Sequence, residues 1–231
     1  RRRHVRRCSL STSTGASPAA APDCIPGGEM VAVGRFGRYL IDTTEVTQRE
    51  YARFLRCRSA APSISECVAV ELRPGPEGEF DPERTPELPV RDLSWCAAAA
   101  YCEWAGRRLC APVTEWQPAC TAVRESIAPA GMVRDPRACV LSAFADGSWG
   151  AGPDDVPQPV RSAADCRGRD GSGYEMVFDI IGNVQEFVTA AGRPTIVGQS
   201  WSSGPFNPCE GRARPEPHEH RPDVGIRCCA E

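Results

Sequence analysis

The segment from Asp179 to Glu186 carries the densest set of oxygen ligands in the sequence. Its two carboxylates stand seven positions apart, and the Gly182-Asn183 pair between them favours a sharp bend of the backbone. Such a bend lets both carboxylates face one hard cation while backbone carbonyls supply further oxygens, the ligands that Ca²⁺ prefers. The segment therefore predicts a calcium site. The same residue types also occur in ordinary surface turns, so the pattern alone leaves both interpretations open.

Histidine-based and nucleotide-based chemistry has little support in the sequence. Of the three histidines, His218 and His220 would share one face of an extended segment beside Glu216 and Glu219. A metal site there lacks a third imidazole, so a solvated loop is the preferred interpretation. The sequence also lacks a Gly-x-Ser-x-Gly elbow, a P-loop, a dinucleotide-binding glycine pattern and His-Glu-x-x-His. These absences argue against the enzyme classes that depend on those motifs.

The 13 cysteines among 231 residues are more than a reducing compartment usually tolerates. No Cys-x-x-Cys pair is present, which disfavours a zinc ribbon or a thioredoxin-like site. We therefore expect disulfides and an extracytoplasmic location, periplasmic, cell-surface or secreted, with at least one thiol left over because the number is odd. Proximity along the chain suggests Cys57 with Cys67 and Cys139 with Cys166, although spacing does not fix connectivity.

Charge and hydropathy limit the classes of partner. Basic residues number 27 against 30 acidic ones, and the net charge of -3 gives no electrostatic reason to expect nucleic acid or an anionic membrane as a partner. No stretch approaches the roughly 18 apolar residues of a membrane-spanning helix. We expect a monomer, with a disordered Arg-rich and then Ser/Ala/Pro-rich segment over residues 1–24 and one domain over residues 25–231.

The local patterns predict few regular elements. Capping boxes open helices at Thr47 and at Thr114, and Ser94 caps a further helix. On that further helix Cys96 and Cys102 point about 120° apart, so each must have a different partner. Alternating apolar residues indicate short strands at residues 29–33, 39–41, 174–178 and 224–229. These elements predict an α+β fold, a single compact domain with little regular secondary structure and long loops stapled by disulfides.

Six motifs follow one another along the chain. They are ID-x-x-EVT-x-x-x-Y-x-x-F at residues 41–54, PV-x-x-x-SW-x-x-A-x-x-YC-x-W-A-G-x-RL at 89–109, EW at 115–116, D-x-x-GNV-x-E at 179–186, GQSW at 198–201 and GIRC at 225–228. Together they resemble the motifs of the sulfatase-modifying-factor family, the formylglycine-generating enzymes and their relatives, in which the last two read GGSW and GFRC. The resemblance covers nearly the whole domain.

This resemblance implies a C-type-lectin-like domain with bound calcium. Carried over residue by residue, the calcium ligands would be the side chains of Asp179 and Glu186 and the carbonyls of Gly182 and Val184. This set agrees with the oxygen-rich bend described above. The family's second calcium site has no counterpart that these motifs identify.

The resemblance also implies a copper chemistry that the sequence does not support. The family's enzymes oxidise a substrate cysteine to formylglycine with O₂, using Cu(I) held by two cysteines just beyond the GGS motif. Here Ser203 occupies the first of these positions, and Cys209 lies only near the second. Soft Cu(I) prefers thiolates, and a hydroxyl does not replace one. Cys209 is then a candidate for a disulfide, with Cys228 or Cys229.

Two functions follow from this departure. The first is a catalytically inactive relative, a pseudoenzyme that acts as an exported binding or scaffold module and recognises a protein or surface ligand through its long loops. The alternative is an active copper-dependent oxidase in which Cys209 is a catalytic residue together with a cysteine adjacent in space.

Overall fold

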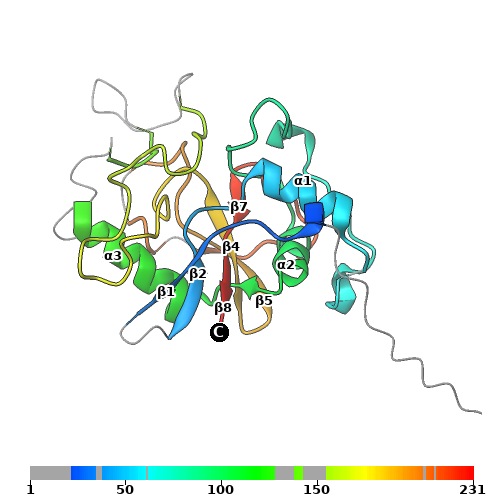
Figure 1. The fold of residues 1–231 in the computed structure, drawn as a ribbon, viewed down its shortest axis with the longest axis horizontal. Helices are drawn as coiled ribbons and strands as arrows, with labels where there is room; N and C mark the ends of the chain where they lie inside the picture. The colour runs from blue at the N-terminus through cyan, green and yellow to red at the C-terminus, as the bar shows by residue number, and fades with distance from the viewer. Residues whose placement is uncertain are drawn as a thin grey trace, which may run out of the picture.

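The computed structural model describes residues 22–34, 38–60, 62–127, 138–142, 155–204, 207–210 and 212–231. The strands gather in the middle of the molecule, with α3 on one side and α1 and α2 on the other (Figure 1). Most of the predicted N-terminal segment lies outside the described residues. Its last three residues, Pro22–Cys24, form a 3-10 turn that Cys24 joins to α1 through a disulfide with Cys57.

Two four-stranded sheets form the centre of the domain. The first is antiparallel, with the order β1 (Met30–Val33), β2 (Tyr39–Asp42), β8 (Cys228–Ala230), β3 (Arg108–Leu109). The second has the order β6 (Arg212–Ala213), β5 (Arg193–Val197), β4 (Gln185–Ala190), β7 (Val224–Ile226), and its β4–β7 pair is parallel. The first two strands agree with the sequence prediction.

The chain passes from one sheet to the other at Arg227. Residues 224–229, predicted as one strand, are two strands instead, because β7 pairs with β4 in the second sheet and β8 pairs with β2 and β3 in the first. Arg227 is the residue between them, and its side chain is fully buried. The junction of the two sheets therefore contains a guanidinium group that needs partners in the interior.

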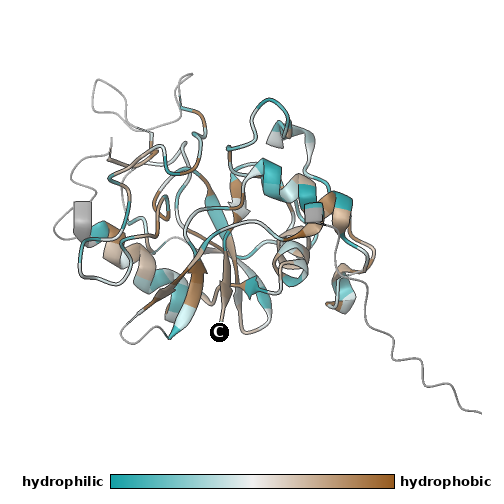
Figure 2. Cartoon of the chain, in the orientation of Figure 1, coloured by the Kyte–Doolittle hydropathy of each residue, from teal (hydrophilic) through white to brown (hydrophobic). Residues whose placement is uncertain are grey.

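Local capping signals predict two of the helices correctly. Thr47 and Glu50 form the expected capping box at the start of α1 (Gln48–Cys57), and the Ser94 hydroxyl accepts the Ala97 amide at the start of α2 (Trp95–Trp104). Figure 2 shows α1 as largely hydrophilic, as expected for a helix that buries one face. Its buried face includes Tyr51 and Phe54, which pack on Tyr101 of α2.

The third predicted helix starts earlier than its capping signal suggests. Residues Pro112–Trp116 are already helical, in the π form, and α3 continues over Gln117–Ile127. Thr114 therefore lies inside a helical turn and is not an N-cap, so that prediction is wrong. The Glu115 carboxylate instead accepts the Ala111 amide, which precedes the turn.

The second half of the chain is more regular than predicted. The β4–β5 hairpin, which the local patterns do not predict, turns at Ala191 and Gly192, both with positive φ (49° and 75°) as in a two-residue hairpin turn. The predicted strand at 174–178 is wrong. Those residues form turns, and only Phe178 makes a β-bridge, with Arg167.

Six disulfides crosslink the described residues, as expected for loops with little regular structure. They join Cys24–Cys57, Cys67–Cys96, Cys102–Cys228, Cys110–Cys229, Cys120–Cys209 and Cys139–Cys166. Cys139–Cys166 and the separate partners of Cys96 and Cys102 confirm the predictions. The expected pair of Cys57 with Cys67 is wrong, because Cys57 reaches back to the N-terminal turn.

No helix among the described residues is long and apolar enough to cross a membrane.

The hydrophobic core has two parts. One includes Ile41, Trp116 and Val188, and the other includes Phe187 and the aromatic residues of α1 and α2. Adjacent residues of β4 thus face opposite parts of the core, which is why a strand buried on both sides carries Phe-Val without a polar residue between them.

Candidate functional site

The bend predicted from Asp179 to Glu186 is present and leads into β4. Asp179, Gly182 and Asn183 all have positive φ, at 56°, 85° and 55°, so the chain reverses sharply within five residues. A Cβ on Gly182 would lie 2.3 Å from the carbonyl oxygen of Val140, so this position requires glycine. The segment is buried, and its carboxylates therefore face the interior and not the solvent.

Glu186, the first predicted side-chain ligand, already has two strong partners. One carboxylate oxygen accepts Nε of Arg227 at 2.9 Å, and the other accepts Nε1 of Trp116 at 2.6 Å. Burial raises the pKa of Glu186 above its usual value, while the Arg227 charge and both bonds act in the opposite direction. Glu186 thus forms a buried ion pair at the junction of the two sheets.

Asp179, the second predicted side-chain ligand, is only half satisfied. Its Oδ2 accepts the backbone amide of Arg161 at 2.6 Å, whereas its buried Oδ1 has no hydrogen-bond partner in the described protein. Burial is the main cause that raises the pKa of Asp179, to about 6, with a smaller contribution from the Glu186 charge, while the Arg161 amide bond and the Arg227 charge act in the opposite direction. An orphaned carboxylate oxygen at this depth is the feature expected of a cation ligand.

A third carboxylate, Glu45, lies in the same buried region. Its side chain is 1% exposed, and neither of its oxygens has a hydrogen-bond partner among the described residues. Burial raises its pKa well above the usual value, and the next largest contribution is repulsion from Asp179. Glu45 lies in the first of the six motifs, which by itself predicts no ligand role for it.

Arg227 is the buried cation of this region. Besides Glu186, it donates Nη1 to the carbonyl of Asp42 at 2.8 Å and Nη2 to the carbonyl of Phe178 at 2.9 Å. Burial opposes its charge, but Glu186, Glu45 and Asp179 together raise its pKa. Arg227 therefore joins β2, the bend and β4 through one side chain.

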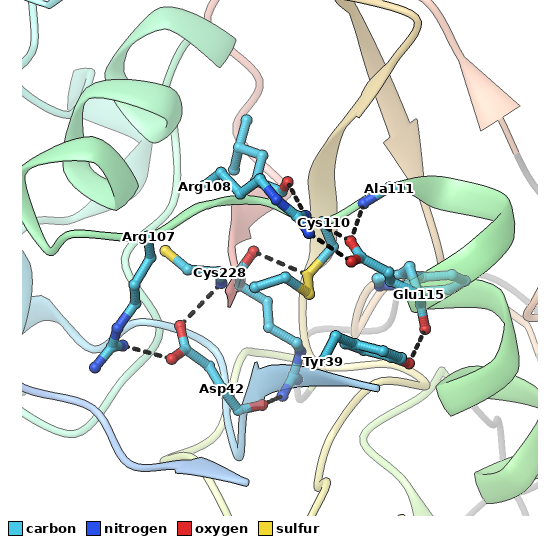
Figure 3. The surroundings of a disulfide bond; sticks show 12 residues. Tyr39, Asp42, Arg107, Arg108, Cys110, Ala111, Glu115 and Cys228 are labelled. Carbon is cyan, nitrogen blue, oxygen red and sulfur yellow. Dashed lines mark hydrogen bonds and ion pairs between the residues drawn. A yellow bond between two sulfur atoms is a disulfide. The ribbon is translucent and has the colours of Figure 1, made fainter. Parts of the chain in front are cut away.

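The disulfide of Cys110 with Cys229 is surrounded by hydrogen bonds and ion pairs (Figure 3). Arg108 donates two bonds of 2.7 Å to the Glu115 carboxylate, and the Tyr39 hydroxyl donates to the Glu115 carbonyl. Among the described residues, one group of three His, Cys, Asp or Glu side chains has its possible metal-binding atoms within 4.8 Å of one another. It consists of Cys110, Glu115 and Cys229. Their sulfurs are bonded together and the carboxylate holds an arginine, so they form a structural network and not a metal site.

The predicted histidine pair does not form a site with the acids beside it. His220 is partly buried, with Nδ1 lying 2.9 Å from the carbonyl oxygen of Asp92, whereas His218 is exposed.

A recess of about 410 Å³ beside α2 is lined by Arg107 and Arg108, among others. These cations are already paired, with Asp42 and with Glu115, so the recess offers no free charge from those two residues.

The segment to which the family resemblance assigns the copper cysteines contains hydroxyls. The Ser200 side chain is fully buried, and its Oγ lies 3.0 Å from that of Ser202 and 3.4 Å from that of Ser203. Cys209 is bonded to Cys120 of α3, with the two sulfurs 2.06 Å apart. The expected bond of Cys209 to Cys228 or Cys229 is therefore wrong. Every cysteine that the structure describes is in a disulfide, and Cys8 lies outside the described residues.

Comparison with known proteins decides the family. The model of the sulfatase-modifying factor enzyme 1-like domain matches residues 29–231. The chain belongs to this family. No curated protein sequence matches it.

Solved structures share the fold of this sulfatase-modifying-factor domain at low sequence identity. The crystal structure of CarF has a TM-score of 0.55 and 14% identity, covering 83% of this chain and 85% of CarF. PvdO from Pseudomonas aeruginosa has a TM-score of 0.53 and 16% identity, covering 89% of this chain and 91% of PvdO. Treponema denticola variable protein 1 has a TM-score of 0.51 and 15% identity, covering 88% of this chain and 92% of the Treponema protein. The expected compact α+β, C-type-lectin-like domain is confirmed, and these similarities concern the fold alone.

Proposed function

We propose that this domain is a non-catalytic member of its family, an exported binding or scaffold module stabilised by calcium and disulfides. The observation that carries the proposal is the Cys120–Cys209 disulfide. Copper chemistry needs two facing thiolates, whereas here Ser203 presents a hydroxyl and the sulfur of Cys209 is already bonded. An oxidase that uses Cys209 would first require reduction of a disulfide whose sulfurs are buried.

Calcium is the cofactor that we propose for the bend. The Asp179 side chain and the carbonyls of Gly182 and Val184 would hold it, together with a second carboxylate that the family pattern assigns to Glu186. The orphaned Oδ1 of Asp179 supports this assignment, because a buried carboxylate oxygen without a donor suits a hard cation. When bound, the ion would supply positive charge and crosslink the chain, with no redox chemistry of its own.

The crosslinks support an extracytoplasmic location. Six disulfides would not persist in a reducing compartment, and each stabilises a domain by about 2–4 kcal/mol. A protein or surface ligand remains the proposed partner. We propose that long connections recognise it, such as residues 58–94, whose described part contains short 3-10 turns and isolated β-bridges. We propose that the chain acts as a monomer and does not bind nucleic acid.

A peptide oxidation assay tests the absence of catalysis. The disulfide-intact protein is incubated with Cu(I), O₂ and a sulfatase-type peptide that contains the substrate cysteine, and the peptide mass is followed. An active formylglycine-generating enzyme in parallel provides the positive control. We expect no change in peptide mass. Formation of the aldehyde would overturn the proposal and establish the oxidase.

A further inference from the structure

We propose that Glu45 is a direct ligand of the calcium ion, in the position that the family pattern assigns to Glu186. This inference rests on the proposed calcium site and identifies its second carboxylate. The observation behind it is the set of hydrogen bonds made by the buried carboxylates. Some carboxylate oxygens already accept a bond from a protein donor, and others accept none.

Three buried carboxylate oxygens lack a hydrogen-bond partner in the described protein. Two belong to Glu45 and the third is Oδ1 of Asp179. Both side chains are 1% exposed, so bulk water cannot solvate them well. An ionised carboxylate that is buried without a donor is strongly unfavourable, so a favourable partner is required. A cation between these two acids would supply that partner to both.

Glu186 is committed elsewhere. Its two oxygens accept the Arg227 guanidinium and the Trp116 indole at 2.9 and 2.6 Å. Both oxygens of Glu186 therefore accept strong donors, whereas neither oxygen of Glu45 has a hydrogen-bond partner among the described residues. Glu186 positions Arg227, and Glu45 is the acid left to bind the ion.

The backbone holds the segments that carry Glu45 and Asp179 side by side. The Phe178 amide donates to the carbonyl of Thr43 at 2.8 Å, so the residue before Asp179 is joined to a residue two positions before Glu45. Arg161 strengthens the same contact, since its guanidinium bonds the Thr43 hydroxyl while its amide bonds Asp179. An ion here would crosslink segments that are distant in the sequence.

The local charge also matches a divalent ion. Three buried carboxylates, on Glu45, Asp179 and Glu186, surround one buried guanidinium, on Arg227. With every acid ionised, the region has an excess of two negative charges. A single Ca²⁺ would neutralise that excess, whereas a monovalent cation would leave one carboxylate uncompensated.

Isosteric variants distinguish the roles of the two glutamates. The experiment compares three disulfide-intact proteins: wild type, Glu45→Gln and Glu186→Gln. For each, calorimetry measures the calcium affinity, and thermal unfolding gives the midpoint in EDTA and in CaCl₂. We expect calcium to raise the wild-type midpoint. Glu45→Gln should lose at least about tenfold in calcium affinity, yet unfold in EDTA no earlier than wild type, because it removes an uncompensated charge. Glu186→Gln should unfold earlier in EDTA but keep its response to calcium.

The outcomes separate this inference from the calcium proposal itself. If wild type binds calcium and Glu45→Gln binds it equally well, or if Glu186→Gln alone abolishes binding, the inference is wrong and the calcium site stands. If wild type shows no response to Ca²⁺, both fail, and protons must satisfy the buried acids. Far-ultraviolet circular dichroism and non-reducing intact mass establish that each variant is folded with its disulfides formed.

Discussion

The sulfur of Cys209 is bonded to that of Cys120, which ties the segment after the Ser200–Ser203 hydroxyl cluster to helix α3. The family resemblance would place a pair of copper thiolates in this part of the chain. Here the segment supplies a crosslink that closes 89 residues of sequence. Cys209 is therefore part of the crosslinked framework of the domain.

Restoring the first cysteine alone is not expected to restore copper binding. In Ser203→Cys the new thiol would have no thiolate partner, because Cys209 stays in its disulfide. We predict no stoichiometric Cu(I) in competition with a chelator and one more alkylatable thiol than in wild type. Binding of one equivalent of Cu(I) by this variant, and not by Ser203→Ala, would contradict the prediction.

The Cys120–Cys209 crosslink should contribute more to stability than the one at the edge of the domain. In the chain-entropy description, the 89-residue separation gives roughly 1 kcal/mol more stabilisation than the 33-residue separation of Cys24–Cys57. Replacing both cysteines of each pair by alanine avoids free thiols, and urea unfolding compares the two variants. The Cys120 variant should unfold first, all the more because its pair is buried. The reverse order would show that these bonds act through native-state strain and not through the unfolded chain.

Removing the buried guanidinium should be costly. Arg227→Met would leave Glu186 charged and without its ion-pair partner, which we expect to destabilise the fold by about 3–5 kcal/mol. Adding Glu186→Gln should recover part of that loss, because the uncompensated charge is removed. Urea unfolding of the two single variants and the double variant measures the coupling. Additive losses would contradict a direct ion pair.

Acid should weaken the network around the Cys110–Cys229 disulfide through Glu115. Burial alone would raise the pKa of Glu115, but the Arg108 bonds and the Ala111 amide hold it below its usual value. A depressed pKa contributes stability above about pH 4.5, the ordinary glutamate range, and that contribution is lost as the pH falls through the folded-state value. Glu115→Gln should therefore be less stable than wild type at pH 6, with the difference shrinking below pH 4. A constant difference would show that Glu115 acts by packing alone.

Short-range signals in the sequence predicted part of the fold. The caps at Thr47 and Ser94 were correct because the interacting groups lie within three residues of each other. The pair of Cys57 with Cys67 was wrong because nearness in sequence does not decide which cysteines meet in the fold. The β4–β5 hairpin lies outside the prediction, although both of its strands contain β-branched residues on either side of the Ala-Gly turn, a pattern that favours a hairpin.

The candidate site was predicted only where its residues are close in sequence. Asp179 and Glu186 could be identified because they share one bend, and the family motif reinforced them. Glu45 could not, since it joins the bend through the hydrogen bond between Phe178 and Thr43, a contact between distant segments. Arg227 likewise lies in a motif, but its role depends on the change of sheet between β7 and β8, which no local pattern indicates.

Counting thiols and copper on one preparation tests the central claim most directly. The intact mass of the chain is measured before and after reduction, and Cu(I) is then titrated into the unreduced protein. Loss of copper chemistry predicts that reduction adds the hydrogens of six bridges and that the unreduced protein binds no stoichiometric copper. One tightly bound Cu(I) per chain that Cys209→Ser removes would contradict the account and identify an oxidase.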